Sequence, residues 1–141
     1  MLNSTGLFEI VCLCISSNCT SVLSALKNSQ GFKYAGSDNV DEVAWYISNS
    51  GDEIHPVGQK KPNGFGLYDM SGNVWDWVWD RFGNYSSGGQ TDPTGPDSGP
   101  LRVLRGGSWD GGARNARVSG RSSVDPAYRF VVLGFRLVLT P

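Results

Sequence analysis

The segment that decides the fold is LYDMSGNVWDWVWD, residues 67–80. Trp75, Trp77 and Trp79 occupy alternate positions in it, and alternate residues of a β-strand point to the same side of a sheet. The pattern therefore predicts an extended segment with one aromatic side, entered through a turn. The opposite side of this segment carries Val74, Asp76, Val78 and Asp80.

Two aspartates lie close together around that turn. The side chains of Asp69 and Asp76 and the backbone carbonyls of Gly72 and Val74 fall within eight residues, and a turn followed by a strand can bring them around one point. Hard oxygen ligands of this kind suit Ca²⁺. The same aspartates also suit capping of the turn through backbone hydrogen bonds, and no EF-hand pattern is present. Spacing alone leaves both interpretations open.

Length and composition favour one loop-rich globular domain. A chain of 141 residues is long enough to bury a core. It contains 19 glycines, 18% charged residues and 11% aromatic residues, a composition that argues against both disorder and a long helical bundle.

The formal net charge of −1 conceals an asymmetry. Residues 101–141 hold seven Arg and two Asp, whereas residues 1–100 hold five Lys or Arg and eleven Asp or Glu. The arginines are interleaved with Gly, Ser and Val, and the acidic half of the domain can pair with them, so we predict no nucleic-acid binding. Because Lys is absent from this half, we expect planar guanidinium groups to bind carbonyls and carboxylates in loops.

Residues 1–28 differ in character from the rest of the chain and hold all three cysteines, Cys12, Cys14 and Cys19. Their spacing matches neither a zinc site nor a disulfide framework. The apolar run at residues 7–15 is interrupted by Glu9 and is far shorter than the ~20 residues that span a bilayer. We expect no membrane span, and we find no clear signal peptide or lipoprotein box.

The remaining sequence predicts short elements joined by long loops. Acidic and capping residues at 38–42 predict a short helical turn that carries Val43, Ala44 and Trp45 inward. Residues 82–100 read as a surface loop and 101–104 as a strand ended by Gly106-Gly107. A second loop begins at Trp109, and residues 129–139 predict a core strand with a bulge or close backbone approach at Gly134. The lone His55 is expected to be structural.

Three blocks in the expected order resemble the formylglycine-generating enzyme, or sulfatase-modifying factor, family: PNGFGLYDMSGNVWDW at 62–77, RVLRGGSW at 102–109 and LGFRLV at 133–138. The resemblance covers roughly residues 29–141. It implies an α+β, C-type-lectin-like fold that is loop-rich, with a small mixed sheet and little helix. Residues 1–28 do not match the family's usual start, so we expect a truncated or out-of-frame amino-terminal segment, with about half of a complete family domain missing.

The catalytic members of the resembled family oxidise a substrate cysteine to formylglycine with copper held by two cysteines just beyond the Gly-Gly-Ser block. The corresponding stretch here, DGGARNA at 110–116, contains no cysteine. Gly and Ala cannot replace the thiolates that Cu(I) prefers, and a single His cannot supply a His-rich iron site. We therefore expect no copper and a non-catalytic protein; the alternative is a catalytic formylglycine-generating enzyme or a non-haem oxidase fragment.

The two ends of the last third resemble a second branch of this family, the variable proteins of diversity-generating retroelements. In that branch a diversified surface lies between an RVLRGGSW start and a GFRLV finish. The resemblance implies a protein or cell-surface ligand bound by residues 109–130. The candidate contacts are Trp109, Asp110, Gly111, Asn115, Ser119, Ser122, Asp125, Tyr128 and Phe130.

The resemblance also bears on the metal question left open by spacing. Asp69, Gly72, Val74 and Asp76 match the positions that hold calcium in the resembled enzymes, so we expect a structural Ca²⁺ there. Family members are often exported or displayed on a surface, but this sequence leaves the cellular location open.

Overall fold

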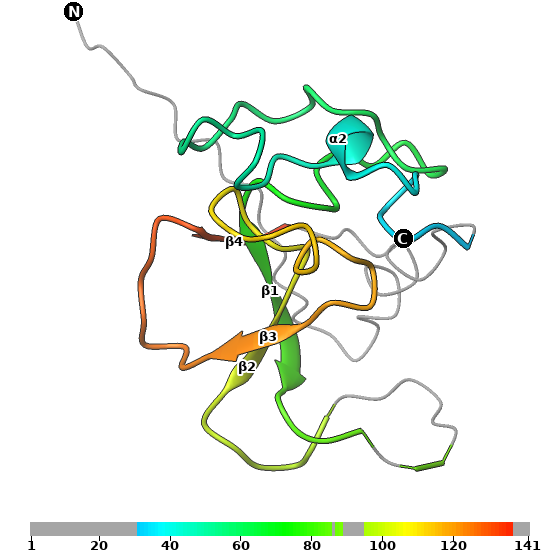
Figure 1. Ribbon diagram of the computed structural model, residues 1–141. Helices are drawn as coiled ribbons and strands as arrows, with labels where there is room; N and C mark the ends of the chain where they lie inside the picture. The colour runs from blue at the N-terminus through cyan, green and yellow to red at the C-terminus, as the bar shows by residue number, and fades with distance from the viewer. Residues whose placement is uncertain (1–30, 86, 89–94, 137–141) are drawn as a thin grey trace, which may run out of the picture.

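A computed structural model describes residues 31–85, 87–88 and 95–136. The described chain contains one short helix, α2 (Val40–Val43), and four strands: β1 (Trp75–Arg81), β2 (Arg102–Arg105), β3 (Ser122–Val124) and β4 (Leu133–Gly134). Loops and turns make up the rest, with α2 and its neighbouring loops beyond one end of the strands (Figure 1). Residues 1–28, which were expected to be atypical, lie outside the described residues.

The strands form one mixed sheet in the order β3-β2-β1-β4. β1 is antiparallel to β2, with Trp77 opposite Leu104, and β2 is antiparallel to β3. β4 is parallel to β1 and pairs through Leu133 and Gly134. The small mixed sheet and scarce helix confirm the predicted fold class.

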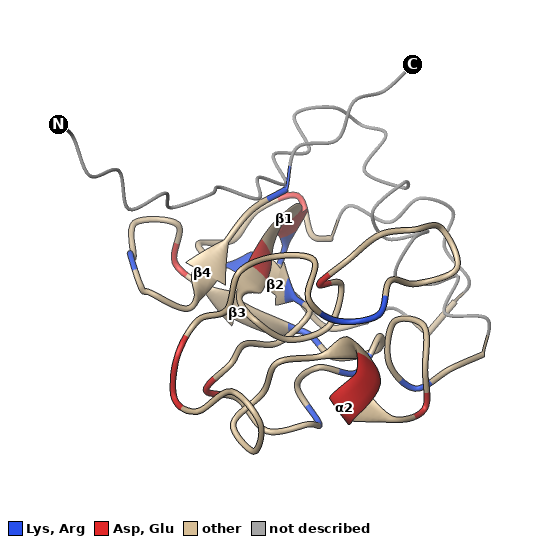
Figure 2. Ribbon diagram, turned by 90° about the horizontal axis from the view of Figure 1, so that it is seen from above, with Lys and Arg blue, Asp and Glu red and all other residues tan. Residues whose placement is uncertain are grey.

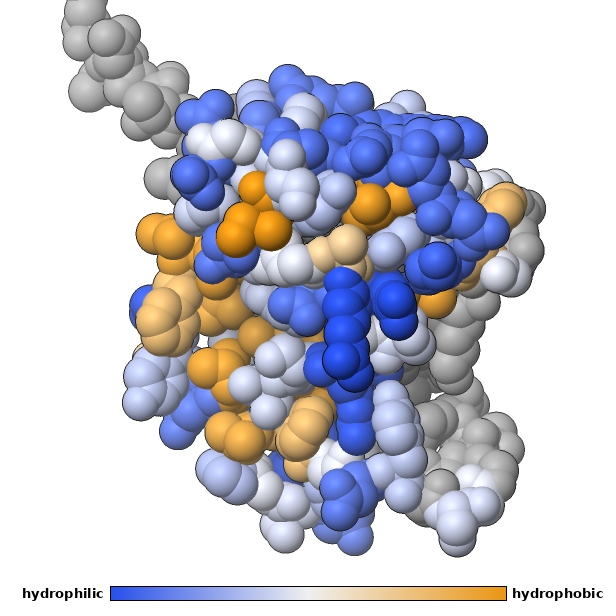
Figure 3. Space-filling view, viewed as in Figure 1, coloured by the Kyte–Doolittle hydropathy of each residue, from blue (hydrophilic) through white to orange (hydrophobic). Residues whose placement is uncertain are grey.

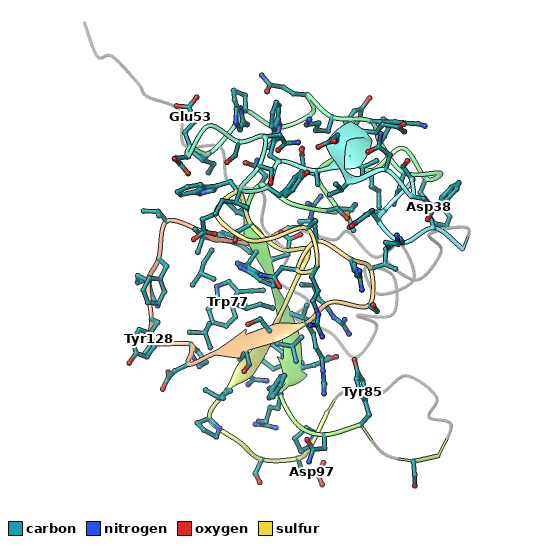
Figure 4. All side chains as sticks on the ribbon, in the orientation of Figure 1. Asp38, Glu53, Trp77, Tyr85, Asp97 and Tyr128 are labelled. Atoms are coloured by element: carbon teal, nitrogen blue, oxygen red, sulfur yellow. The ribbon has the colours of Figure 1, made fainter. Side chains whose placement is uncertain are left out.

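β1 alternates as predicted, but its buried side is the one without tryptophan. Asp76 and Val78 are buried, Trp75 and Trp77 are partly buried, and Trp79 is 52% exposed. Trp77 projects from β1 toward the side on which Tyr128 lies (Figure 4). The guanidinium of Arg102 lies over the ring of Trp79 at 4.7 Å, which is a cation–π contact. The Trp79 ring stays partly open to solvent.

α2 begins as its sequence predicts, but it ends at Val43, well before the Gly51-Asp52 pair that was expected to close it. Asn39 is the N-cap, and its side chain accepts a hydrogen bond from the backbone N–H of Asp41. Asp41 and Glu42 in the first turn give the helix its acidic character (Figure 2). Val43 and Ala44 turn inward and are buried, whereas Trp45 is only partly buried. Val43 and Ala44 join Tyr34 and Ala116 in a small core cluster that connects α2 to the last third of the chain.

The segment after Trp109 is not one continuous loop. Ser122–Val124 form β3, with Ser122 opposite Leu104 and Val124 opposite Arg102. A Ser-Ser-Val triplet has too little apolar alternation to signal a strand, so pairing with β2 decides its conformation. The prediction of an uninterrupted loop over 109–128 was therefore wrong.

The predicted core strand at 129–139 was also wrong over much of its described length. Phe130 is 54% and Val131 80% exposed, and only Leu133–Gly134 pair with β1. The backbone N–H of Leu133 donates to the carbonyl of Phe130, forming a turn that ends any extended run there. Residues 137–139 lie outside the described residues. A close approach at Gly134 is confirmed, because a Cβ there would lie 2.7 Å from Cγ2 of Val74.

Arginines bind backbone carbonyls in the loops, as expected from the absence of Lys. Arg102 donates to Trp79, Arg105 to Ser119 and Gly120, Arg121 to Gly83, and Arg129 to Pro126 and Tyr128. Pairing with carboxylates is rarer than expected. In the described part of the chain, the seven arginines of the last third form one ion pair, between Arg136 and Asp76.

Candidate functional site

The turn before β1 brings the predicted metal ligands Asp69 and Asp76 near one another. Asp69 is buried, has a positive φ of 53°, and accepts a hydrogen bond from the backbone N–H of Gly58 through Oδ2 at 2.8 Å. Asp76 is buried on β1, and its Oδ2 accepts a hydrogen bond from Nε of Arg136 at 2.7 Å. The Arg136 guanidinium also donates to the carbonyls of Tyr68 and Asp69. One cation thus connects the carboxyl end of the described chain to both sides of the turn.

The electrostatics of Asp76 show that its charge is only partly compensated. Burial raises the pKa of Asp76 above its ordinary value of 3.8, Arg136 opposes that rise, and the negative charge of Asp69 adds to it. Its Oδ1 atom is buried and has no hydrogen-bond partner among the described residues. A buried carboxylate oxygen without a partner is unfavourable, so this atom is suited to accept a further cation or donor.

The oxygen chemistry of this turn fits Ca²⁺. Asp69 and Asp76 would supply carboxylate oxygens, and Gly72 and Val74 backbone carbonyls, all of which are hard ligands. The backbone N–H of Gly72 donates to the carbonyl of Gly106, which fixes the turn against the loop after β2. Gly72 also packs tightly, since a Cβ at this position would lie 2.7 Å from the backbone nitrogen of Trp45.

The first predicted binding residues lie beside the segment after α2. Ser50 Oγ donates to the carbonyl of Trp109, and the backbone N–H of Ile47 donates to the carbonyl of Gly111. Trp109 is partly buried, and its indole N–H has no hydrogen-bond partner in the described structure. The other two candidates here, Asp110 and Asn115, are exposed.

The last predicted binding residues follow β3 in the chain. Asp125 Oδ1 accepts a hydrogen bond from the backbone N–H of Ala127, which shapes the turn after β3. Tyr128 and Phe130 follow, 55% and 54% exposed, with parallel rings 5.7 Å apart. This segment runs along the left edge of the molecule in Figure 1 and contributes to the hydrophobic area on the left side of Figure 3. The candidate contacts therefore form two surface segments, 109–121 and 125–130, which are joined by β3. Ser119 is exposed in the 109–121 segment, and Ser122 lies in β3 itself.

His55 takes the structural position expected of it. Its ring stacks on Trp45 with centroids 3.7 Å apart, and Nε2 lies 2.7 Å from the carbonyl of Ser50. Asn73 accepts from the backbone N–H of His55 and donates to its carbonyl. Lys60 Nζ lies 3.8 Å from the centroid of the Trp45 ring. These contacts order the loops that support the 109–111 segment.

A match to the sulfatase-modifying factor enzyme 1-like domain covers residues 23–141, which includes the turn before β1, all four strands and both surface segments. The chain belongs to that family. The family match begins at residue 23, slightly before the boundary near residue 29 drawn from the three sequence blocks.

Relatives within the sulfatase-modifying factor family differ in their named roles. The chain is 44% identical over 86 residues to the formylglycine-generating enzyme of Streptomyces coelicolor, covering 57% of this chain and 27% of that protein. It is 36% identical over 110 residues to the chaperone protein LppX of Paenibacillus barcinonensis, covering 66% and 36%. The chain thus spans about a third of the length of these curated relatives.

A solved structure supports the same family assignment. The chain resembles Treponema denticola variable protein 1 with a TM-score of 0.77 and 41% sequence identity, over 83% of this chain and 44% of that one. The C-type-lectin-like fold inferred from the resemblance is therefore confirmed. In the described residues, no helix is long and apolar enough to cross a membrane.

Sequence reasoning missed residues that border the 109–121 segment. Arg105 donates to the carbonyl of Gly120 in the turn at residues 117–120, and Arg121, directly after that turn, lies over the rings of Phe82 and Tyr85 at 4.7 and 3.8 Å. The arginine content of the last third was a signal for this cluster. It did not reveal which groups each arginine contacts, because these groups come from separate loops.

Proposed function

We propose that the chain is a non-catalytic ligand-binding module, of the variable-protein type found with diversity-generating retroelements, that presents residues 109–130 to a protein or cell-surface ligand. The observation that carries the proposal is the likeness to Treponema denticola variable protein 1, at 41% identity over 83% of the chain. Surface loops on a fixed scaffold are where binding residues concentrate. The exposed Asp110, Asn115, Ser119, Tyr128 and Phe130 all belong to this region.

The composition of the surface supports binding rather than oxidation. Tyr and Phe contribute large contact areas with few rotatable bonds, and aromatic residues are enriched in the centres of protein interfaces. Residues 110–116 provide no thiolate for copper, and every cysteine of this sequence precedes residue 20.

Sequencing the same gene from sibling isolates tests the variable-protein proposal. We expect substitutions to concentrate at the exposed positions of 109–130, while residues 60–80, which build the turn and β1, stay constant. Equal variation in the two segments would contradict a diversified binding surface.

The second candidate function is formylglycine formation, favoured by the 44% identity to the Streptomyces coelicolor enzyme. Incubation of the chain with copper, oxygen and a Cys-x-Pro-x-Arg peptide separates the two functions. We expect the peptide mass to stay unchanged, with the Streptomyces coelicolor enzyme as the active control. Conversion of the peptide cysteine to an aldehyde would establish catalysis instead.

We also propose that the turn before β1 binds a structural Ca²⁺ through Asp69, Gly72, Val74 and Asp76. The support is the unpartnered Oδ1 atom of Asp76, the nearby Asp69 carboxylate and the all-oxygen ligand set. A bound cation would offset the negative charge that Arg136 alone leaves partly compensated. The ion would stabilise the turn and the start of β1 rather than take part in a reaction.

A further inference from the structure

Three arginines lie in or next to the turn at residues 117–120: Arg117 within it, Arg121 directly after it, and Arg105, whose guanidinium donates to its carbonyls. The backbone N–H of Gly120 donates to the carbonyl of Arg117 at 2.8 Å, closing the turn. Arg105, at the end of β2, donates to the carbonyl of Gly120 at 2.9 Å, and Arg121 directly follows the turn. We call Arg105, Arg117 and Arg121 the arginine cluster. The strongly hydrophilic column in the middle of Figure 3 lies beside β3 and the loop that precedes it.

Two of the three guanidinium groups are held in place. Arg121 donates to the carbonyl of Gly83 at 2.6 Å and lies against the Tyr85 and Phe82 rings. Arg105 is fixed by the carbonyls of Ser119 and Gly120, and its buried Nε–H has no hydrogen-bond partner in the described structure. A guanidinium that is already ordered loses less conformational entropy when it binds a partner.

The arginine cluster lacks a carboxylate partner in the described part of the chain. The ion pairs found there join Lys61 to Glu42 and Arg136 to Asp76. The two aspartates of the last third have other contacts: Asp110 accepts from Ser108 Oγ at 2.5 Å, and Asp125 accepts from a backbone N–H. Preordered cations without counter-charges favour an anionic partner.

We propose that the arginine cluster recognises carboxylates on an acidic protein segment, and that this contact selects the ligand of the 109–130 surface. The inference rests on the proposed binding function and names the chemistry of its partner. A short acidic segment fits better than a nucleic acid. The chain's net charge is −1, so its remaining surface repels a long polyanion, whereas a local group of carboxylates meets only the cluster. Arg105, Arg117 and Arg121 also offer the fork geometry that pairs with carboxylates.

Fluorescence anisotropy with a labelled oligo-glutamate peptide tests this inference on the full chain. We expect binding that weakens as salt rises from about 50 mM to about 500 mM, since exposed charge pairs are screened. The double variant Arg117→Gln, Arg121→Gln should bind about tenfold more weakly. The matched control, Lys33→Gln with Lys61→Gln, removes the same charge at exposed positions outside both the cluster and the 109–130 surface, and should bind as the wild type does.

Further measurements separate a specific site from loss of folding. Arg121 also holds the loop at Gly83, so the single variant Arg117→Gln, at an exposed position, is measured alongside and should retain the wild-type melting temperature while binding about threefold more weakly. Equal loss in the control variant, no binding of the peptide by the wild type, or tighter binding of a single-stranded oligonucleotide of equal charge would overturn the inference. Variation among sibling genes remains an independent test of the binding function, so the two proposals can fail separately.

Discussion

Single glycines fix the positions of backbone segments around the turn. Gly72 has a φ of 77°, and a Cβ there would lie 2.7 Å from the backbone nitrogen of Trp45 and 2.9 Å from Cβ of Ala44. Gly66 has nearly the same φ, 76°, but a Cβ there would meet nothing within 4 Å. The pair therefore separates conformational strain from steric conflict.

Gly72→Ala should destabilise the fold far more than Gly66→Ala. We expect Gly66→Ala to lower the free energy of unfolding by about 1–2 kcal/mol, the strain of a left-handed residue. Gly72→Ala should lower it by about 3 kcal/mol or more, because the Trp45 backbone must also move. Urea unfolding of both variants measures the difference, and equal losses would show that the backbone near Trp45 moves without resistance.

Calcium should raise the melting temperature through Asp69 and Asp76. We expect millimolar calcium to stabilise the wild type relative to chelator, since a ligand that binds the folded state alone shifts unfolding. Asp69→Asn keeps the shape of the side chain, removes one charge and should reduce that calcium response. Lys61→Gln changes a residue of opposite charge outside the turn. As the control, it should leave the calcium response unchanged. An identical wild-type melt with calcium and with chelator would reject the site and leave the aspartates as turn-capping residues.

Short elements here depend on pairing more than on their own sequence. β3 has three residues and β4 two, and neither has a pattern that distinguishes it from a loop. In contrast, the alternation of β1 and the acidic cap of α2 are local features and were predicted correctly. Elements with a local signal were recognisable, whereas those formed by partners from distant segments were not.

We expect Glu42 to make the stability of the fold around α2 depend on pH. A hydrogen bond from Ser37 Oγ at 3.0 Å lowers the pKa of Glu42 below its ordinary value of 4.5, burial opposes the shift, and Lys61 adds to it. Because the pKa is lowered by folding, the stabilising contribution is present above pH 4.5 and is lost as the pH falls through the lower, folded-state pKa.

We expect Glu42→Gln to lower the melting temperature slightly at neutral pH and to match the wild type once the wild-type carboxylate is protonated. Melting curves from pH 7 down to about pH 3 measure this convergence. Glu53→Gln, outside the helix, is the control with the same change of charge. A difference that persists unchanged at acidic pH would mean that lost packing, not lost charge, destabilises the Glu42 variant.

At the scale of the whole molecule, one small core joins α2 to the 109–121 segment. Val43 is 1% exposed and packs in the cluster that contains Ala116, at the back of the 109–121 segment. Val43→Ala should lower the free energy of unfolding by about 2 kcal/mol through lost burial and a residual cavity. Hydrogen exchange should also accelerate at the backbone N–H of Val118, which donates to the carbonyl of Lys33.

The matched control for Val43→Ala is Val131→Ala. Val131 is 80% exposed, so the same truncation should change the free energy of unfolding by less than about 0.5 kcal/mol. Equal destabilisation by the two substitutions would mean that the exposed 125–131 segment is packed in solution.

The sequence by itself determined the family, the fold class and the turn. Its three blocks carry the family's local patterns, and the alternation from Trp75 to Asp80 specifies a strand without reference to the rest of the chain. Local chemistry also determined the N-cap of α2 and the use of arginine for carbonyls, because each depends on neighbouring residues or on side-chain type alone.

Only the tertiary structure decided which side of β1 is buried, that Ser122–Val124 form a strand, and which loop carbonyls the arginines bind. Hydrophobicity would bury the tryptophans, yet Asp76 lies inside because Arg136, 60 residues away, donates to it. The turn at Phe130–Leu133 likewise exposes Val131, which its sequence would place in a core strand. Each outcome depends on contacts between distant segments, and these contacts outweigh the preferences of any one segment.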